Sequence, residues 1–284
     1  MNPILVETIK ELPPLPQTVI ELRNYVDSSG ADLEISKVAA ILSKDPLIVG
    51  ELLRLANSPF YGLSRQVSTI QQVVSLLGAG TIKNTVMANA VRSSFSINVS
   101  PYGLDNNTFL TNCSKEVDFI SAWLREEDKA LANELIPCAM LLRLGMILLS
   151  DMLIKSGKDK EFLEQNKIND FQDVHDLENQ YCGVDSISFL GFLFNYWEFD
   201  ERLIQSIAYI HNPHAAAQEI KKNAYALAVT NCLFEPYHPL SQFNSKKSIA
   251  LVNEAMGQGV NFNMANFLAK LPEEAKENLI KDDN

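Results

Sequence analysis

The side chains best suited to hold a transition metal in this sequence are its histidines and cysteines, because imidazole nitrogen and thiolate sulfur bind such ions strongly. The four histidines are His175, His211, His214 and His238, and none has the HExxH or HxH spacing of a local metal motif. His211 and His214 are three residues apart, but Pro213 disfavours a continuous helix between them. A surface or capping pair is therefore favoured over a metal pair, and we expect no cofactor.

Other catalytic motifs are absent from the sequence. The cysteines are widely scattered and form no CxxC pair; they are Cys113, Cys138, Cys182 and Cys232. We expect reduced, mostly buried thiols rather than nucleophiles or disulfides. The sequence contains no GxSxG elbow, no Walker A motif and no GxGxxG loop.

The segment LRLANSPFYG carries two adjacent aromatic residues directly after a helix stop. Its central residues are Asn57, Ser58, Pro59, Phe60 and Tyr61. Paired aromatics usually belong to a core, so packing is the favoured interpretation of this segment. The alternative is a loop that presents its aromatic rings to a protein partner.

The charge of the chain argues against nucleic acid as a partner. The net charge of the 284 residues is −11 at pH 7. Residues 1–98 hold eight acidic and eight basic side chains, so residues 99–284 carry the whole excess. Phosphate backbones are bound by clustered Lys and Arg, and the basic residues here are spaced apart. A regulator that binds nucleic acid through residues 1–98 is therefore the least favoured function.

The most apolar stretch, residues 139–154, is shorter than the ~20 residues that span a bilayer, and it contains Arg143 and Asp151. We interpret it as a buried core helix and expect no membrane association. The N-terminus has no basic region followed by an apolar run, so we expect no secretory signal. These features predict a cytoplasmic protein.

Helical periodicity recurs along the whole chain, and no long segment alternates apolar and polar residues. Asp45 and Pro46 fit an N-cap and a first helical position, and Ser68 with Gln71 fits a capping box. Residues 156–169 are polar and predict a surface loop with one helical turn. The other helices that we predict beyond residue 107 span residues 108–125, 131–155, 170–182, 184–196, 200–212, 216–235, 245–257 and 264–281.

A Pro-, Gly- and Asn-rich break at residues 98–107 divides the predicted chain into two helical lobes. We place the first lobe at residues 1–98, the second at 105–235 and a C-terminal helical extension at 236–284. The fold class that this predicts is all-α.

Several landmarks occur in order over residues 12–95, and together they resemble the HDOD family. They are LPPLP at 12–16, KDP at 44–46, LANSPFYG at 55–62, VSTI at 67–70 and LLG at 76–78. The resemblance implies an HD-phosphohydrolase-like helical bundle, and residues 105–235 look like its degraded HD-type half. Trp197 matches a tryptophan of the family, and we expect it to pack between helices.

The HD enzymes to which this family is related hold divalent metals through His and Asp side chains, and the metal activates a water molecule. Carried onto this chain, the resemblance implies that the ligand positions fall at Asn112, Leu142, Arg143, Ser186, His211 and Asn231. Leucine cannot bind a metal, and Arg143 places a permanent positive charge where the cation would sit. We therefore expect no metal site and no catalytic residues.

Two alternatives remain for Arg143. In the first, Arg143 and His211 line a pocket that binds an anion such as a phosphate-bearing ligand. In the second, which we favour, a core carboxylate pairs with Arg143, with Asp185 as one candidate, because a buried charge must be paired.

The resemblance implies a non-catalytic bacterial signal-transduction or output module in motility, chemotaxis or cyclic-di-GMP-linked regulation. Its expected partners are unidentified signalling proteins or a second copy of the chain. The alternative is an active HD-type metal-dependent phosphohydrolase that acts on a nucleotide.

Overall fold

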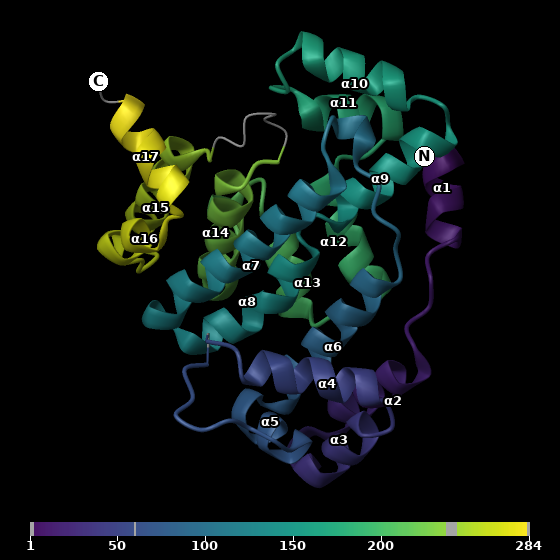
Figure 1. Cartoon of the computed structure of the whole chain (residues 1–284), viewed down its shortest axis with the longest axis vertical. Helices are drawn as coiled ribbons and strands as arrows, with labels where there is room; N and C mark the ends of the chain where they lie inside the picture. The colour runs from purple at the N-terminus through teal and green to yellow at the C-terminus, as the bar shows by residue number, and fades with distance from the viewer. Residues whose placement is uncertain (1–2, 60, 237–242, 283–284) are drawn as a thin grey trace. The chain divides into compact units, whose positions relative to one another are not determined.

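The computed structural model describes residues 3–59, 61–236 and 243–282, and within them every regular element is a helix. This confirms the all-α prediction. Figure 1 shows the helices along the chain, which here keep its labels. The α-helices that follow the first one, α1 (Pro3–Lys10), are α2 (Gln17–Ser29), α3 (Ile35–Leu42), α4 (Pro46–Ala56), α5 (Ile70–Leu77), α6 (Ala79–Ser93), α7 (Asn106–Glu127), α8 (Lys129–Leu141), α9 (Leu144–Lys155), α10 (Asp159–Ile168), α11 (Val174–Cys182), α12 (Ser186–Tyr196), α13 (Glu201–Ala208), α14 (Gln218–Leu233), α15 (Ser245–Gly257), α16 (Met264–Lys270) and α17 (Glu273–Asp282).

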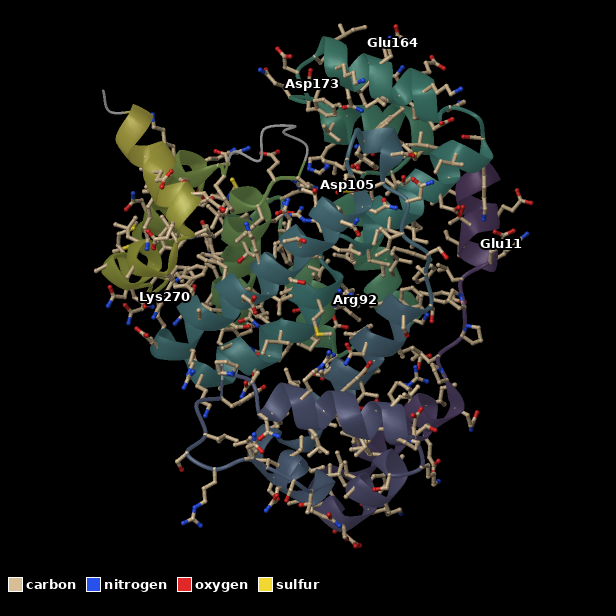
Figure 2. All side chains as sticks on the ribbon, in the orientation of Figure 1. Glu11, Arg92, Asp105, Glu164, Asp173 and Lys270 are labelled. Atoms are coloured by element: carbon tan, nitrogen blue, oxygen red, sulfur yellow. The ribbon has the colours of Figure 1, made fainter. Side chains whose placement is uncertain are left out.

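The chain divides into two compact units, one formed by Pro13–Phe95 and one formed by Met1–Leu12 together with Ser96–Asn284. This division differs from the predicted lobes at both ends of the chain. The helix α1 packs against α9 in the larger unit. Glu11, which lies just after α1 and is labelled in Figure 2, pairs with Lys155 at 2.8 Å. The C-terminal helices also join this unit, because α15 packs along α14.

The smaller unit contains α2 to α6, whose apolar faces form its core. Asp45 caps α4 by accepting hydrogen bonds from Leu47 N and Ile48 N, with Pro46 at the first helical position, as predicted. The capping box of α5 lies one residue later than predicted. Thr69 and Gln72 form it, because Thr69 adopts the extended backbone of an N-cap and Gln72 reaches back to its amide.

The larger unit is built around α7, α8, α9, α12, α13 and α14. Consecutive helices pack on each other, and α9 with α12 and α14 with α7 and α8 are packed pairs that lie far apart in the sequence. The predicted helix 131–155 is in fact two helices, because the chain breaks at Leu142 and Arg143. Arg143 has φ −98° and ψ 7°, outside the helical region, and it therefore marks the break between the two helices. The stretch Lys129–Lys155, which covers these two helices, is long and apolar enough to cross a membrane. Its most apolar part is 83% buried inside the protein, as expected of core helices.

The polar segment predicted as a loop contains the helix α10 instead. Its Phe162 is fully buried and packs edge-on against Tyr102 at 5.2 Å and Tyr181 at 5.7 Å between ring centroids. One deeply buried ring therefore anchors a helix whose other residues are mostly polar, which periodicity alone does not reveal. The predicted start at 170 is also wrong, because α11 begins at Val174.

The start of α9 lies directly against the start of α12. A methyl group on Gly145 would overlap the backbone carbonyl of Ser186, so only glycine allows this approach. The contact fixes the break that carries Arg143 beside the loop that carries Asp185.

We expect Gly145→Ala to lower the free energy of unfolding by at least about 1–3 kcal/mol, because the added methyl meets backbone that cannot move aside cheaply. The matched control is Gly191→Ala in α12, where the new methyl meets Ile207 at an ordinary 3.8 Å. Alanine is favoured over glycine inside a helix, so this control should be neutral or slightly stabilising. Urea denaturation measures both, and equal stabilities of the two variants would contradict the close approach.

Candidate functional site

Arg143 is the centre of a buried polar network in the larger unit. Its Nε donates to Glu116 Oε1 at 2.8 Å, and its Nη1 donates to Asn231 Oδ1 at 2.7 Å. Its Nη2 donates to the backbone carbonyls of Asn231 and Phe234, each at 3.1 Å. The side chains of Arg143 and Glu116 are only 6% and 1% exposed, so this is a buried ion pair.

Two helices and the break between two others bring this network together. Glu116 lies one turn after Asn112 on α7, Asn231 lies near the end of α14, and Arg143 lies at the break between α8 and α9. The end of α14 leaves backbone carbonyls without helical partners, and the guanidinium bonds two of them. Burial raises the pKa of Glu116, and the charge of Arg143 and its hydrogen bond oppose that rise.

The core carboxylate predicted for Arg143 is present, but it is Glu116 and not Asp185. Each guanidinium nitrogen donates a hydrogen bond inside the protein, which favours the paired interpretation of Arg143 over the anion pocket with His211. Glu116 was missed because its importance depends on α7 facing the break after α8. The charged Glu116 on an otherwise buried helix face was the one available signal.

The positions implied for HD-type metal ligands do not fit a metal. Leu142 is buried and has no donor atom, and Arg143 and Asn231 bond to each other. Ser186 donates its backbone N–H to Glu178 Oε2 at 2.8 Å, and Asn112 is half-buried on α7. A divalent cation beside the Arg143 guanidinium would face like charge with too few ligands.

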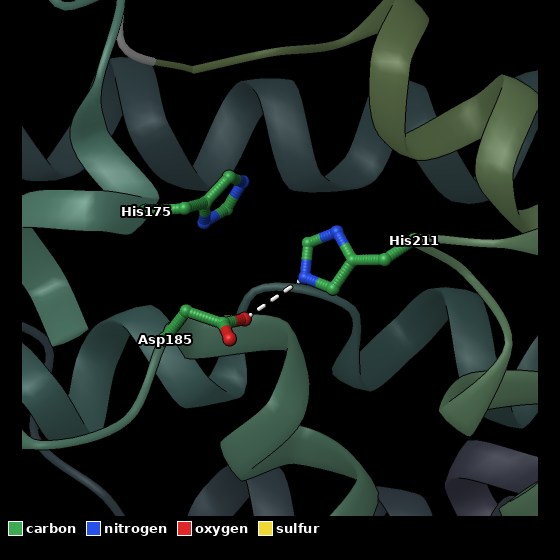
Figure 3. Close-up of side chains that lie close together, drawn as sticks. All are labelled: His175, Asp185 and His211. Carbon is green, nitrogen blue, oxygen red and sulfur yellow. Dashed lines mark hydrogen bonds and ion pairs between the residues drawn. The ribbon is translucent and has the colours of Figure 1, made fainter.

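The remaining implied position, His211, belongs to a different group of side chains. His211 Nε2 lies 2.9 Å from Asp185 Oδ1, and the His175 ring stands edge-on to the His211 ring with centroids 5.1 Å apart. One ligand atom from each of His175, Asp185 and His211 lies within 4.8 Å of the others. Figure 3 shows the three side chains converging from separate segments.

Each member of this group is positioned by its own local structure. Asp185 is the N-cap of α12 and accepts from Ile187 N and Ser188 N. His175 lies in the first turn of α11, and its Nδ1 is 3.0 Å from Oε2 of the fully buried Glu178. His211 lies between α13 and the short 3₁₀ helix Pro213–Ala215.

Burial and hydrogen bonds shift the pKa values of two members of this group, Asp185 and His175. Burial would raise the pKa of Asp185, but the bonds from His211 and Ser188 hold it well below its usual range. Burial likewise would lower the pKa of His175, but the hydrogen bond to Glu178 and nearby carboxylates raise it above its usual value. The sequence did not single out His175, because 36 residues and two helices separate it from His211.

Asn57 holds in place the segment 57–61, for which core packing is the favoured interpretation and an interaction loop the alternative. Its side chain bonds the carbonyls of Leu53 and Val67 at 2.9 and 2.8 Å and accepts from Val67 N at 2.8 Å. Tyr61 is 3% exposed, and burial raises its pKa to about 12, so its ring packs inward. Ser58 is half-buried, Pro59 is exposed, and Phe60 lies outside the described residues.

Comparisons with known proteins agree with this fold. A profile of the HDOD domain matches residues 12–213. The chain is similar to the crystal structure of a virulence factor from Campylobacter jejuni subsp. jejuni, with 50% identity, coverage of 98% of this chain and 100% of that chain, and a TM-score of 0.63. An HDOD domain protein with unknown function from Geobacter sulfurreducens shares the fold at 17% identity, with 98% of this chain and 94% of that chain covered and a TM-score of 0.62.

A protein from Marinobacter aquaeolei VT8 described as a signal transduction protein also shares the fold, at 15% identity and a TM-score of 0.53; the match covers 91% of this chain and 59% of that one. A curated relative, an uncharacterized protein from Treponema pallidum (strain Nichols), is 24% identical over 234 residues. The match covers 80% of this chain but 43% of that protein, so the chain spans less than half its length.

We expect Arg143→Met to lower the free energy of unfolding by about 3–5 kcal/mol at pH 7, because it leaves Glu116 buried without its cation. The pKa of Glu116 should then rise further above its unfolded value, so the folded state holds the proton to higher pH. The loss should therefore shrink as the pH falls toward about 4, the carboxyl's unfolded range, and grow as the pH rises. Denaturant titrations across this range measure it.

The control for this prediction is the double variant Arg143→Met with Glu116→Leu. It buries no unpaired charge, so it should be more stable than Arg143→Met alone and its loss should not depend on pH in this way. Its remaining loss reflects the carbonyls of Asn231 and Phe234, which keep no guanidinium donor. A loss in Arg143→Met that is the same at every pH would contradict the pairing.

Proposed function

This chain belongs to the HDOD domain family, and we propose that it is a non-catalytic bacterial signal-transduction module that acts by binding other proteins. The observation that carries the proposal is the Arg143 network. Three internal groups satisfy a guanidinium where HD enzymes would hold a cation, so hydrolysis by a metal-activated water has no support at those positions.

The fold supports a role that depends on a stable surface. One protein described as a signal transduction protein shares this fold. The family resemblance adds motility, chemotaxis and cyclic-di-GMP-linked regulation as the pathways in which the module would act. At the positions where HD enzymes bind a metal, the Arg143–Glu116 ion pair would hold the helices together without supporting hydrolysis. The partners would be signalling proteins or a second copy of the chain.

Charge and thiol chemistry support the rest of the proposal. In the smaller unit, Lys44 pairs with Glu21 and Lys83 pairs with Asp27, each at 2.6 Å, so two of its basic side chains are neutralised. This disfavours nucleic acid as the partner. The four cysteines are free thiols, which suits a cytoplasmic location.

The second candidate, an HD-type phosphohydrolase acting on a nucleotide, is favoured by one observation. The group of His175, Asp185 and His211 offers nitrogen and oxygen ligands close to the replaced positions. If a metal-bound water there attacked a phosphoryl group, turnover would depend on these side chains and on added metal.

We expect the purified chain to hydrolyse neither bis(p-nitrophenyl) phosphate nor cyclic di-GMP above the rate in protein-free buffer. The assay adds Mn²⁺, Fe²⁺, Ni²⁺ or Zn²⁺ in turn, and an active HD-type phosphohydrolase serves as the positive control. Metal-dependent turnover that disappears in His211→Ala would overturn the non-catalytic proposal in favour of the second candidate.

The binding half of the proposal is tested by in-cell cross-linking of the tagged chain followed by mass spectrometry. We expect reproducible cross-links to a signalling protein or between two copies of the chain. An untagged strain is the control, and recovery of nothing beyond that background would count against an interaction module.

A further inference from the structure

The group of His175, Asp185 and His211 has the composition and convergence of a metal site. The three side chains come from α11, the N-cap of α12 and the loop after α13, and their ligand atoms lie within 4.8 Å of one another. We propose that they bind one divalent transition-metal ion of the zinc type, at a place that differs from the HD ligand positions. Only His211 belongs to both sets.

The donor set selects the class of ion. Two imidazoles and one carboxylate suit Zn²⁺, Ni²⁺ or Fe²⁺, whereas Mg²⁺ and Ca²⁺ prefer oxygen ligands throughout. The Asp185 side chain is 11% exposed, and those of His175 and His211 are 34% and 43% exposed, so an ion has access from solvent. Three protein ligands leave one coordination position open for water or for an anionic group.

Glu178 orients His175 from behind. This fully buried carboxylate accepts hydrogen bonds from Tyr102 Oη at 2.7 Å and from Ser186 N at 2.8 Å. A carboxylate is only an acceptor, so the proton on its contact with His175 belongs to Nδ1, and Nε2 keeps its lone pair for an ion. Such carboxylate–histidine pairs fix the ring and make it a stronger ligand.

Asp185 is equally well oriented. Oδ1 accepts from Ile187 N and Ser188 N, and Oδ2 accepts from Ser188 Oγ at 2.6 Å. These bonds fix the carboxylate before any ion arrives, which lowers the entropic cost of binding. His211 donates Nε2–H to the same carboxylate. An ion bound between these two ligands would take the place of this proton, and the neutral ring would then carry its proton on Nδ1.

The surrounding charge favours a cation. Glu178 and Glu235 both act electrostatically on His175, and Asp185 adds a third negative group. The guanidinium of Arg143 is engaged by Glu116, Asn231 and Phe234. The field at the site is therefore set by carboxylates.

The test is a Zn²⁺ titration of the chelator-treated, desalted full chain by calorimetry, with metal content after desalting measured by plasma mass spectrometry. Excess Mg²⁺ is kept in the buffer as a competitor. We expect about one equivalent of zinc and a rise in the melting temperature of the zinc-loaded protein. His175→Ala and His211→Ala should each weaken binding by about 10-fold or more.

Two further variants make the result specific. His214→Ala is the matched control, because His214 is three residues from His211 with a side chain 59% exposed, and it should bind zinc like the wild type. Asp185→Asn keeps a good N-cap for α12 while removing the charge, so it should fold normally and bind more weakly. Melting temperatures without zinc verify that each variant is folded.

Less than about a tenth of an equivalent of zinc on the wild type would overturn the site, as would binding that survives both histidine variants. The result is independent of the proposed function. Zinc binding without turnover supports both proposals, turnover overturns only the non-catalytic one, and failure to bind zinc overturns only the site.

Discussion

The larger unit depends on the desolvation of one guanidinium. A buried arginine is tolerated only when acceptors surround it, and those acceptors here come from α7 and from the end of α14. The requirement therefore ties α7 and the end of α14 to the break between α8 and α9. Apolar packing alone would hold these helices together in several registers, whereas the hydrogen bonds of Arg143 are satisfied in one of them.

The same break links the buried ion pair to the histidine group. Gly145 is two residues after Arg143, and its missing side chain lets α9 touch the backbone at Ser186. Ser186 N donates to Glu178, and Glu178 in turn holds His175. A short run of contacts through Ser186 and Glu178 thus links both polar groups, and a shift at α9 would disturb both of them.

The sequence predicted features that are encoded locally. The cap at Asp45 and the helical class depend on residues within one or two turns, where patterns and turn chemistry are informative. The capping box was one residue off, because Ser68 and Thr69 are adjacent candidates and only the backbone conformation chooses between them. The helix α10 was missed because it depends on the burial of Phe162 against sequence-distant rings.

The sequence predicted that Arg143 is paired with a carboxylate, but it did not predict which residues come together. A buried arginine must be paired, so a partner for Arg143 could be predicted. That the partner is Glu116 and not Asp185 depends on how α7 packs against the break, which the sequence does not show. The convergence of His175 with His211 likewise depends on how α11 and α13 are placed, and no spacing rule encodes it.

An ion pair in place of a metal centre, as we propose for this chain, has a simple electrostatic logic. A divalent cation in an HD site neutralises the carboxylates and imidazoles that surround it, and its loss would leave those groups unpaired. In this chain the guanidinium of Arg143 supplies a positive charge at one implied ligand position, Asn231 at another implied position accepts a hydrogen bond from it, and Glu116 balances its charge. The Arg143–Glu116 pair is neutral without an ion, so it holds α7 against the helix break without a metal. Asp185 and His211, which balance each other at the edge of this region, do not need the guanidinium, and for that reason they remain available for a different ligand.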